Sequence, residues 1–140
     1  ARADLSELFA LADPKYAAMV VKHNHKPTEQ VKMDGRVQTT YPRKNWSSLV
    51  LWNCGHSAAR VLSPHQVDMA PADWLHQFKW IPDGEIGSLP VEWNWLCGHC
   101  SSDIEPCIVH HTDGTPAMPG YESAPFADEW RQELSRWASV

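Results

Sequence analysis

The chain has 140 residues, of which 43% are hydrophobic and 21% charged, and a formal net charge of −5 at pH 7. This is enough material for one globular domain with a sizeable core. The excess of acidic residues argues against non-specific binding to nucleic acid or to an anionic membrane, and no apolar run approaches the roughly 18–20 residues of a membrane span. The first residues lack a signal-peptide pattern, and four cysteines without one are typical of a reducing cytoplasm.

The first half of the chain predicts one helix and two strands. Residues 4–12 are expected to form a short helix because their apolar side chains recur at helical spacing on one face. The apolar runs 17–21 (AAMVV) and 47–53 (SSLVLWN) are typical of buried strands. Between them, Asp34-Gly35 predicts a turn within a long polar stretch.

The second half predicts two helices and a third strand. Ser63 has the character of an N-cap and Pro64 of a first helical residue, so residues 64–70 are expected to be helical. Residues 71–90 contain WLHQFKW and the turn-rich IPDGEIGSLP, and 106–111 (PCIVHH) is typical of a strand. The last segment places apolar side chains on one helical stripe, namely Phe126, Trp130, Leu134 and Trp137.

Short buried strands joined by long polar loops are typical of an α/β enzyme whose chemistry sits in the loops. We therefore expect a single domain over residues 1–140, with a short mixed sheet and flanking helices. The predicted first helix has no strand before it, whereas an α/β domain normally leads into such a helix from a strand. For this reason we expect the chain to be the C-terminal part of a longer protein.

Three cysteines and three histidines lie within the stretch EWNWLCGHCSSDIEPCIVHH, residues 92–111. The spacing of Cys97 and Cys100 is shared by zinc sites and thiol redox motifs. A zinc site would need Cys107 and a histidine such as His110 or His111, and a redox pair would need a helix N-terminus after a strand, which the sequence does not indicate. The interpretation we favour over both is unpaired, reduced thiols.

Several segments, in order, resemble one family over about residues 3 to 130: ADLSELFAL, AAMVVKHNHKP, YPRKNWSSLVLWNC, LSPHQVD, WLHQFKW, EIGSLPVEWNWL and VHHTDGTPAMPGY. The family is the nucleotide-sugar glycosyltransferases of GT-A fold, in the glycogenin-like and lipopolysaccharide galactosyltransferase-like group (family 8). Within it the likeness is to uncharacterised bacterial and phage proteins. The resemblance implies a Rossmann-like GT-A domain of which this chain is the C-terminal, acceptor- and metal-side portion.

The resemblance also implies a metal-dependent, retaining transfer of sugar from a nucleotide-sugar donor to a carbohydrate or lipid-linked acceptor. In the family an Asp-x-Asp motif precedes the helix that matches residues 4–12, so those carboxylates would lie upstream. His110 would then complete the site for Mn²⁺ or Mg²⁺, which neutralises charge on the departing diphosphate. No catalytic residue is assigned, and the portion given is expected to be inactive alone.

Two sets of binding residues are expected. On the phosphate side, Lys22 and His23 follow the predicted strand 17–21, at a position where the loops of a parallel sheet gather ligands. The resemblance adds Arg43 and Gly114 to this side, although the loop Gly114-Thr115-Pro116-Ala117 departs from the family pattern. The sugar-binding side would contain Lys44, Asn45, Ser47, Ser48, His76, Gln77, Trp93 and Asn94, whose amides and hydroxyls suit sugar hydroxyls.

The alternative function is a non-enzymatic binding module stabilised by zinc at Cys97, Cys100, Cys107 and His110. Stoichiometric zinc and unfolding by a chelator would favour this module. A half-domain would also leave apolar surface or a sheet edge exposed, so we expect a tendency to self-association.

Overall fold

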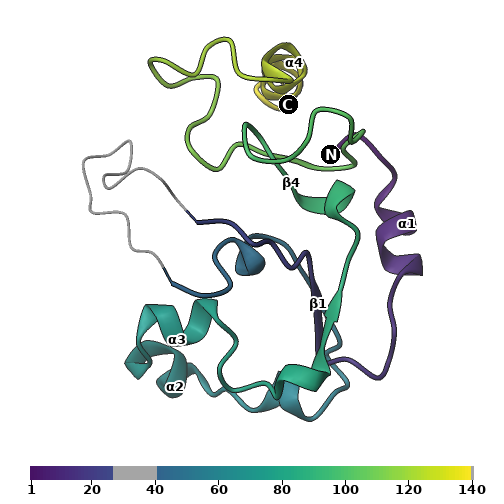
Figure 1. Cartoon of the computed structure of the whole chain (residues 1–140), viewed down its shortest axis with the longest axis vertical. Helices are drawn as coiled ribbons and strands as arrows, with labels where there is room; N and C mark the ends of the chain where they lie inside the picture. The colour runs from purple at the N-terminus through teal and green to yellow at the C-terminus, as the bar shows by residue number, and fades with distance from the viewer. Residues whose placement is uncertain (27–40, 140) are drawn as a thin grey trace.

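The computed structural model describes residues 1–26 and 41–139 as a mixed α/β arrangement (Figure 1). The helices are α1 (Leu5–Ala10), α2 (Pro64–Met69), α3 (Ala72–His76) and α4 (Ala127–Trp137). Short 3-10 helices span Trp46–Ser48 (η1), Ala58–Arg60 (η2), Asp83–Glu85 (η3) and Val91–Asn94 (η4). The strands are β1 (Ala18–Val20), β2 (Val50–Trp52), β3 (Ile86–Ser88), β4 (Trp95–Leu96) and β5 (Val109–His110). The predicted turn at Asp34-Gly35 lies outside the described residues.

Two small sheets organise the chain. In the first, β1 lies between β2, with which it pairs antiparallel, and β3, with which it pairs parallel. In the second, β4 and β5 pair in parallel, with Leu96 opposite His110. The prediction of a short mixed sheet in an α/β fold is confirmed at this level, and no finding supports the finer GT-A assignment.

The apolar run around β1 is buried because both faces of the strand are covered. Successive side chains of a strand point to opposite faces, and here Ala18 and Val20 join one apolar cluster with Phe78 and Ile81. Met19 and Val21 join a second cluster on the other face, with Leu8, Leu89 and Trp93. The C-terminal end of β1 is therefore fixed in a packed core, and the polar segment that follows it starts from a rigid position.

The helix predicted at residues 64–70 is confirmed as α2, for the expected reason. The side-chain oxygen of Ser63 accepts a hydrogen bond from the backbone N–H of Gln66, and Oε1 of Gln66 accepts one from the backbone N–H of Ser63. This reciprocal cap satisfies two of the helix's unpaired donors, and Pro64 occupies the first turn.

Other elements differ from the prediction in extent. The helix expected over 4–12 is shorter, as α1, and the strand expected over 106–111 forms only as β5. The start of the expected strand 47–53 is instead the 3-10 helix η1, before β2 begins. Elements α3 and β3 lie in the stretch 71–90, where no helix or strand was predicted.

Several large apolar side chains remain exposed on the helices at both ends of the chain. Phe9 on α1 is 63% exposed and Trp137 on α4 is 79% exposed. Such surface favours association, and self-association stays a prediction. Within the described part of the chain no helix is both long and apolar enough to cross a bilayer.

Candidate functional site

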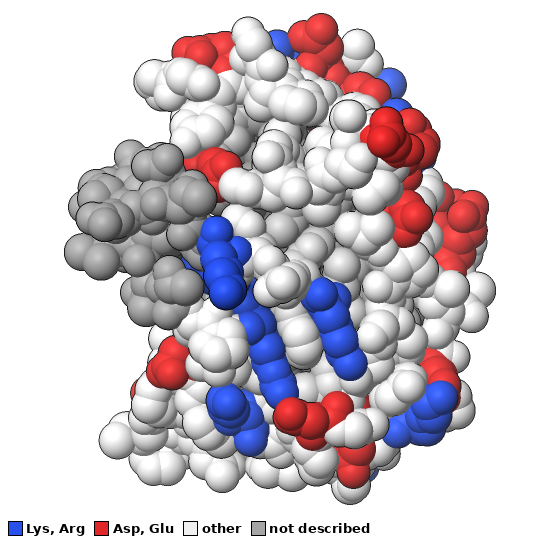
Figure 2. All heavy atoms as spheres, in the orientation of Figure 1, with Lys and Arg blue, Asp and Glu red and all other residues white. Residues whose placement is uncertain are grey.

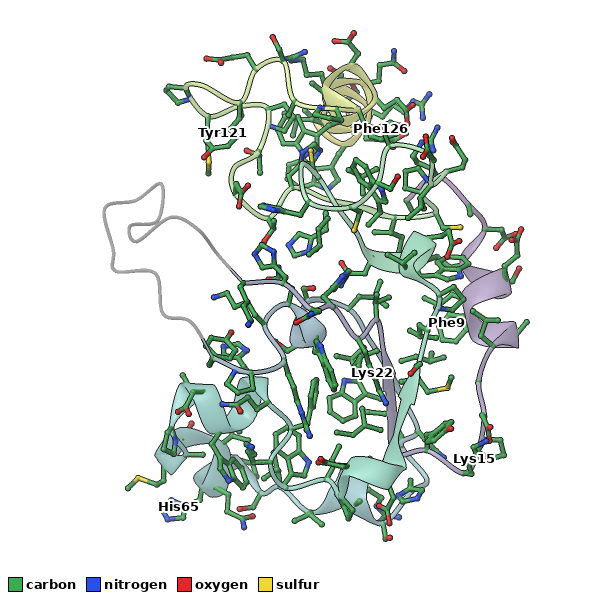
Figure 3. The ribbon with its side chains drawn as sticks, viewed as in Figure 1. Phe9, Lys15, Lys22, His65, Tyr121 and Phe126 are labelled. Carbon is green, nitrogen blue, oxygen red and sulfur yellow. The ribbon has the colours of Figure 1, made fainter. Side chains whose placement is uncertain are left out.

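The candidate site is a pocket at the C-terminal end of β1, where residues 22–26 face residues 41–46. Its volume is about 550 Å³, and among its lining residues are Lys22, His25, Lys26, Tyr41, Arg43 and Trp46. We call it the cationic pocket. Basic side chains gather side by side on the face shown in Figure 2, whereas acidic ones lie mostly towards its edges. Figure 3 labels Lys22 beside β1, in the middle of the same view.

Lys22 and Arg43 come from different segments and are both held in place. The Lys22 ammonium donates to the carbonyl oxygen of Ile86 at 2.7 Å. The Arg43 guanidinium donates to the carbonyl oxygen of Gln77 at 2.8 Å and to the Asp83 carboxylate at 2.6 Å. An ammonium group has three N–H donors and a guanidinium group has five. Each side chain therefore has N–H donors that these bonds do not use and that can bind a ligand.

Trp46 connects the two segments that form the pocket. Its indole Nε1 donates to the carbonyl oxygen of His23 at 2.9 Å. Its ring centroid lies 5.7 Å from Lys22 Nζ and 5.1 Å from Arg43 Cζ, within the range of cation–π attraction. One aromatic ring therefore positions two cations as well as the turn that carries His23.

The backbone near Arg43 is strained. Arg43 and Asn45 have φ angles of 61° and 65°, in the left-handed region, which costs an L-residue roughly 1–2 kcal/mol. Strain of this kind persists where the surroundings enforce it, and it is concentrated at functional sites. Here it accompanies the tight turn that brings Arg43 and Trp46 to the same pocket.

The nearby histidines are neutral at pH 7 because burial disfavours their charged form. Burial lowers the pKa of His23 to about 4, and its Nε2 atom is buried with no hydrogen-bond partner among the described residues. Burial also lowers the pKa of His25 and of His110. The positive charge of the pocket is therefore carried by its lysines and by Arg43.

A second feature, the asparagine network, lies beside the pocket. Asn94 is 1% exposed, and its amide nitrogen donates to Ser48 Oγ at 2.8 Å and to the Asn45 carbonyl at 3.3 Å. Its carbonyl Oδ1 lies 3.2 Å from His110 Nδ1, and Asn45 Nδ2 donates to Thr112 Oγ1 at 3.2 Å. Because Asn94 Oδ1 only accepts, Nδ1 of His110 must carry the proton, which leaves Nε2 as an acceptor.

A third feature connects the pocket wall with a carboxylate. His25, which lines the pocket, lies edge to face with His99, with ring centroids 4.4 Å apart. His99 Nε2 lies 2.7 Å from Asp113 Oδ2. The order from the pocket outwards is therefore His25, His99, Asp113.

The structure brings together most of the residues predicted for the phosphate side and part of the sugar-binding set. Lys22, His23 and Arg43 line the cationic pocket, whereas Gly114 lies away from it, with the Tyr121 ring packed where a side chain would be. Asn45, Ser48 and Asn94 form the asparagine network together with the predicted metal ligand His110.

The remaining predicted residues lie apart from the network. Lys44 lies over the Tyr41 ring, with Nζ 4.7 Å from its centroid. Ser47 Oγ lies 2.8 Å from Nδ1 of His76, and Gln77 is buried against Asp73. Trp93 is 4% exposed in the second core cluster, so it packs the sheet and does not form a pocket wall.

The cysteines do not assemble a zinc site. Cys97 is buried, and its Sγ makes a long contact of 4.0 Å with the Pro125 carbonyl, whereas Cys100 Sγ accepts from the Leu96 backbone N–H. Burial raises the pKa of Cys97 and of Cys107, which disfavours the thiolate that zinc requires. Across residues 1–26 and 41–139, no three His, Cys, Asp or Glu side chains are placed to hold one ion. The described residues therefore do not support the alternative of a zinc-stabilised module. All four cysteines are unpaired in the structure, and their reduced state stays a prediction.

The Mn²⁺ or Mg²⁺ that the resemblance implied stays an untested prediction. The asparagine network presents one imidazole nitrogen of His110 and no carboxylate. Hard cations such as these prefer several oxygen ligands, and the described residues do not supply them around His110.

Sequence analysis missed several residues of the site: His25, Lys26, Tyr41, Trp46, His99 and Asp113. The alternation of basic residues in KHNHK, residues 22–26, was a signal for the first two. Trp46 was overlooked because tryptophan usually packs a core. Nothing in the local sequence connects His99 with Asp113, which meet only because β4 and β5 pair in parallel.

No protein-family profile and no solved structure matches the chain. Over 140 residues it is 46% identical to a curated relative, protein CDI of Arabidopsis thaliana. That relative is not described as a glycosyltransferase, and no glycosyltransferase family matches, so our prediction of a glycosyltransferase is wrong. The alignment covers 96% of this chain and 54% of the relative, so the chain is similar to protein CDI along nearly all of its own sequence and spans about half of that protein's length.

Proposed function

We propose that the cationic pocket binds a small anion with at least two negative charges, such as an organic phosphate or a diphosphate. The observation that carries the proposal is the positive charge of the residues that line the pocket. The chain has a net charge of −5, yet Lys22, Lys26 and Arg43 line the pocket and no aspartate or glutamate of the described residues does.

The donors of the pocket suit phosphate oxygens. Hydrogen bonds from ammonium or guanidinium groups to anionic oxygens are about twice as strong as neutral ones. Lys22 and Arg43 are already positioned by Ile86 and Gln77, so little side-chain entropy is lost when they bind a ligand. Lys26 has no hydrogen-bond or ion-pair partner among the described residues and can add a third contact.

The size of the pocket favours a molecule over a bare ion. A volume of about 550 Å³ lies within the range of roughly 300–1,000 Å³ that is usual for small-molecule sites. Tyr41 contributes an aromatic ring to the wall. Both Lys22 and Arg43 are within cation–π range of the Trp46 ring, and we therefore expect Trp46 to orient cations and Tyr41 to contact the organic part of the ligand.

Calorimetric titration with inorganic pyrophosphate, at low and at moderate salt, tests the proposal. We expect saturable binding that weakens as salt rises, because exposed charge interactions are screened. A neutral polyol of similar size should not bind measurably at the same concentration. Absence of pyrophosphate binding at millimolar ligand and low salt would refute the proposed function.

A further inference from the structure

The histidine in the pocket wall has an arrangement that anion binding alone does not require. His25 lies in the wall, its ring contacts His99, and His99 is bonded to Asp113. An exposed lysine or arginine needs no such support to hold a charge. A partly buried imidazole such as that of His25 does, because desolvation penalises its charged form.

Resting on the anion-binding function, we propose that His25 takes up a proton when the anion enters the pocket and becomes an additional cation of the site. The proton comes from solvent and is released when the anion leaves. The ligands of the site are then anions that place a negative charge next to His25.

The groups around His25 explain why it is neutral in the empty pocket. His99 faces it from the loop after β4, Asp113 from the loop after β5 and Lys44 from the segment before η1. Burial, then His99, lowers the pKa of His25, and Lys44 lowers it further, whereas Asp113 raises it. Other basic groups lie close by, namely Lys22, His23, Lys26 and His110. An anion bound among these groups would raise the pKa of His25 and so favour its protonated form.

Asp113 provides the compensation that a protonated His25 needs, and His99 lies between the two residues. The Asp113 carboxylate accepts from Nε2 of His99, so a neutral His99 carries its proton there and leaves Nδ1 as an acceptor. A carboxylate charge within reach favours the imidazolium form of a neighbouring ring. The chain His25–His99–Asp113 can therefore hold one added proton.

The sign of the coupling follows from linkage. The pKa of free His25 lies below its usual value, and that of the bound form would lie higher. Affinity should then rise as pH falls through the bound-form pKa, by up to about tenfold per pH unit for one proton, and level off below the free-form pKa.

The experiment measures proton uptake directly. Pyrophosphate would be titrated at pH 6.5–7 into wild type, His25→Asn and His65→Asn, in buffers of different ionisation enthalpy. His65 is an exposed histidine on α2, away from the pocket (Figure 3), so this variant is the matched control. The ligand's own protonation is common to all three proteins and cancels in the comparison.

We expect wild type and His65→Asn to take up at least about half a proton more than His25→Asn, and Asp113→Asn to reduce this uptake. Equal uptake in all variants that bind would overturn the inference and leave the proposed function intact, whereas absence of binding in wild type would overturn both. If His25→Asn does not fold, an NMR titration of the His25 ring in wild type, with and without pyrophosphate, tests the inference instead. A pKa that pyrophosphate does not raise would refute the inference.

Discussion

The indole Nε1 of Trp46 donates a hydrogen bond to the carbonyl oxygen of His23 at 2.9 Å. This bond joins the segment that leaves β1 to the segment that carries Arg43. The same ring has Lys22 and Arg43 within cation–π distance. The geometry of the cationic pocket therefore depends on a residue that needs no contact with the ligand itself.

Replacing Trp46 separates its two roles. Trp46→Phe keeps an aromatic face but loses the donor, which is worth about 1 kcal/mol, so we expect pyrophosphate affinity to fall about fivefold. Trp46→Leu also removes the cation–π contacts, at roughly 0.5–1 kcal/mol each, and should weaken binding further. Calorimetry measures both variants, with Trp137→Leu on α4 as the control. Equal affinity in Trp46→Leu and wild type would contradict this role of Trp46.

The close approach at Gly87 gives a test of the fold. A Cβ at this position would lie 2.4 Å from Tyr16 Cδ2 and 2.8 Å from Met19 Cγ. We expect Gly87→Ala to lower the free energy of unfolding by about 1–3 kcal/mol through overpacking. Gly84→Ala is the matched control, because nothing lies within 4 Å of its added Cβ. Urea denaturation compares them, and equal stability of the two variants would argue against this packing of β3 on β1.

Asn94 should be important for stability because it is buried with three polar partners. Asn94→Leu keeps a similar volume but leaves the Asn45 carbonyl, Ser48 Oγ and His110 Nδ1 without this partner. We expect a loss of roughly 2–4 kcal/mol in the free energy of unfolding. Asn53→Leu, at a half-buried surface position, should cost about 1 kcal/mol or less. Similar midpoints in thermal unfolding for the two variants would mean that the asparagine network contributes little.

The depressed pKa of His23 predicts acid destabilisation. The unfolded chain binds a proton at His23 near pH 6.5, whereas burial keeps the folded form neutral down to about pH 4. The contribution of neutral His23 to the free energy of unfolding is therefore fully present above pH 6.5. It is lost as pH falls towards 4, and the loss is roughly 1–2 kcal/mol for this partly exposed residue. The pH dependence of urea unfolding should be shallower in His23→Gln than in His65→Gln. Identical slopes would show that His23 is not buried as a neutral ring.

The sequence predicted those parts of the fold that depend on short-range patterns. The run AAMVV indicated a strand covered on both faces, and Ser63-Pro64 indicated the cap of α2; both are confirmed. Strand β3 was missed because Ile86-Gly87-Ser88 contains one large apolar residue, and its place is set by pairing with β1. Its glycine is required by the tertiary contact with Tyr16, which a local pattern does not reveal.

The site was predictable only in part, for the same reason. The position after the predicted strand 17–21 indicated Lys22 and His23, and the resemblance indicated Arg43. The cysteine spacing in LCGHC left zinc and redox chemistry open as alternatives, and the structure places the thiols in different surroundings. Spacing along the chain does not determine which side chains converge. His99 and Asp113 follow the paired strands β4 and β5, and His25 reaches His99 from the segment after β1, in the other sheet.

The central claim is that position, and not net charge, makes this pocket bind anions. Lys22→Gln and Lys15→Gln each remove one positive charge from the chain, but Lys15 is exposed beside Asp13, away from the pocket (Figure 3). The deciding measurement is the dissociation constant of pyrophosphate for wild type and these two variants at equal salt. We predict that Lys22→Gln weakens binding roughly 10- to 100-fold, as expected for a charge-assisted hydrogen bond of about 1.5–3 kcal/mol, and that Lys15→Gln changes it less than about twofold. Equal affinities in the two variants would contradict the account.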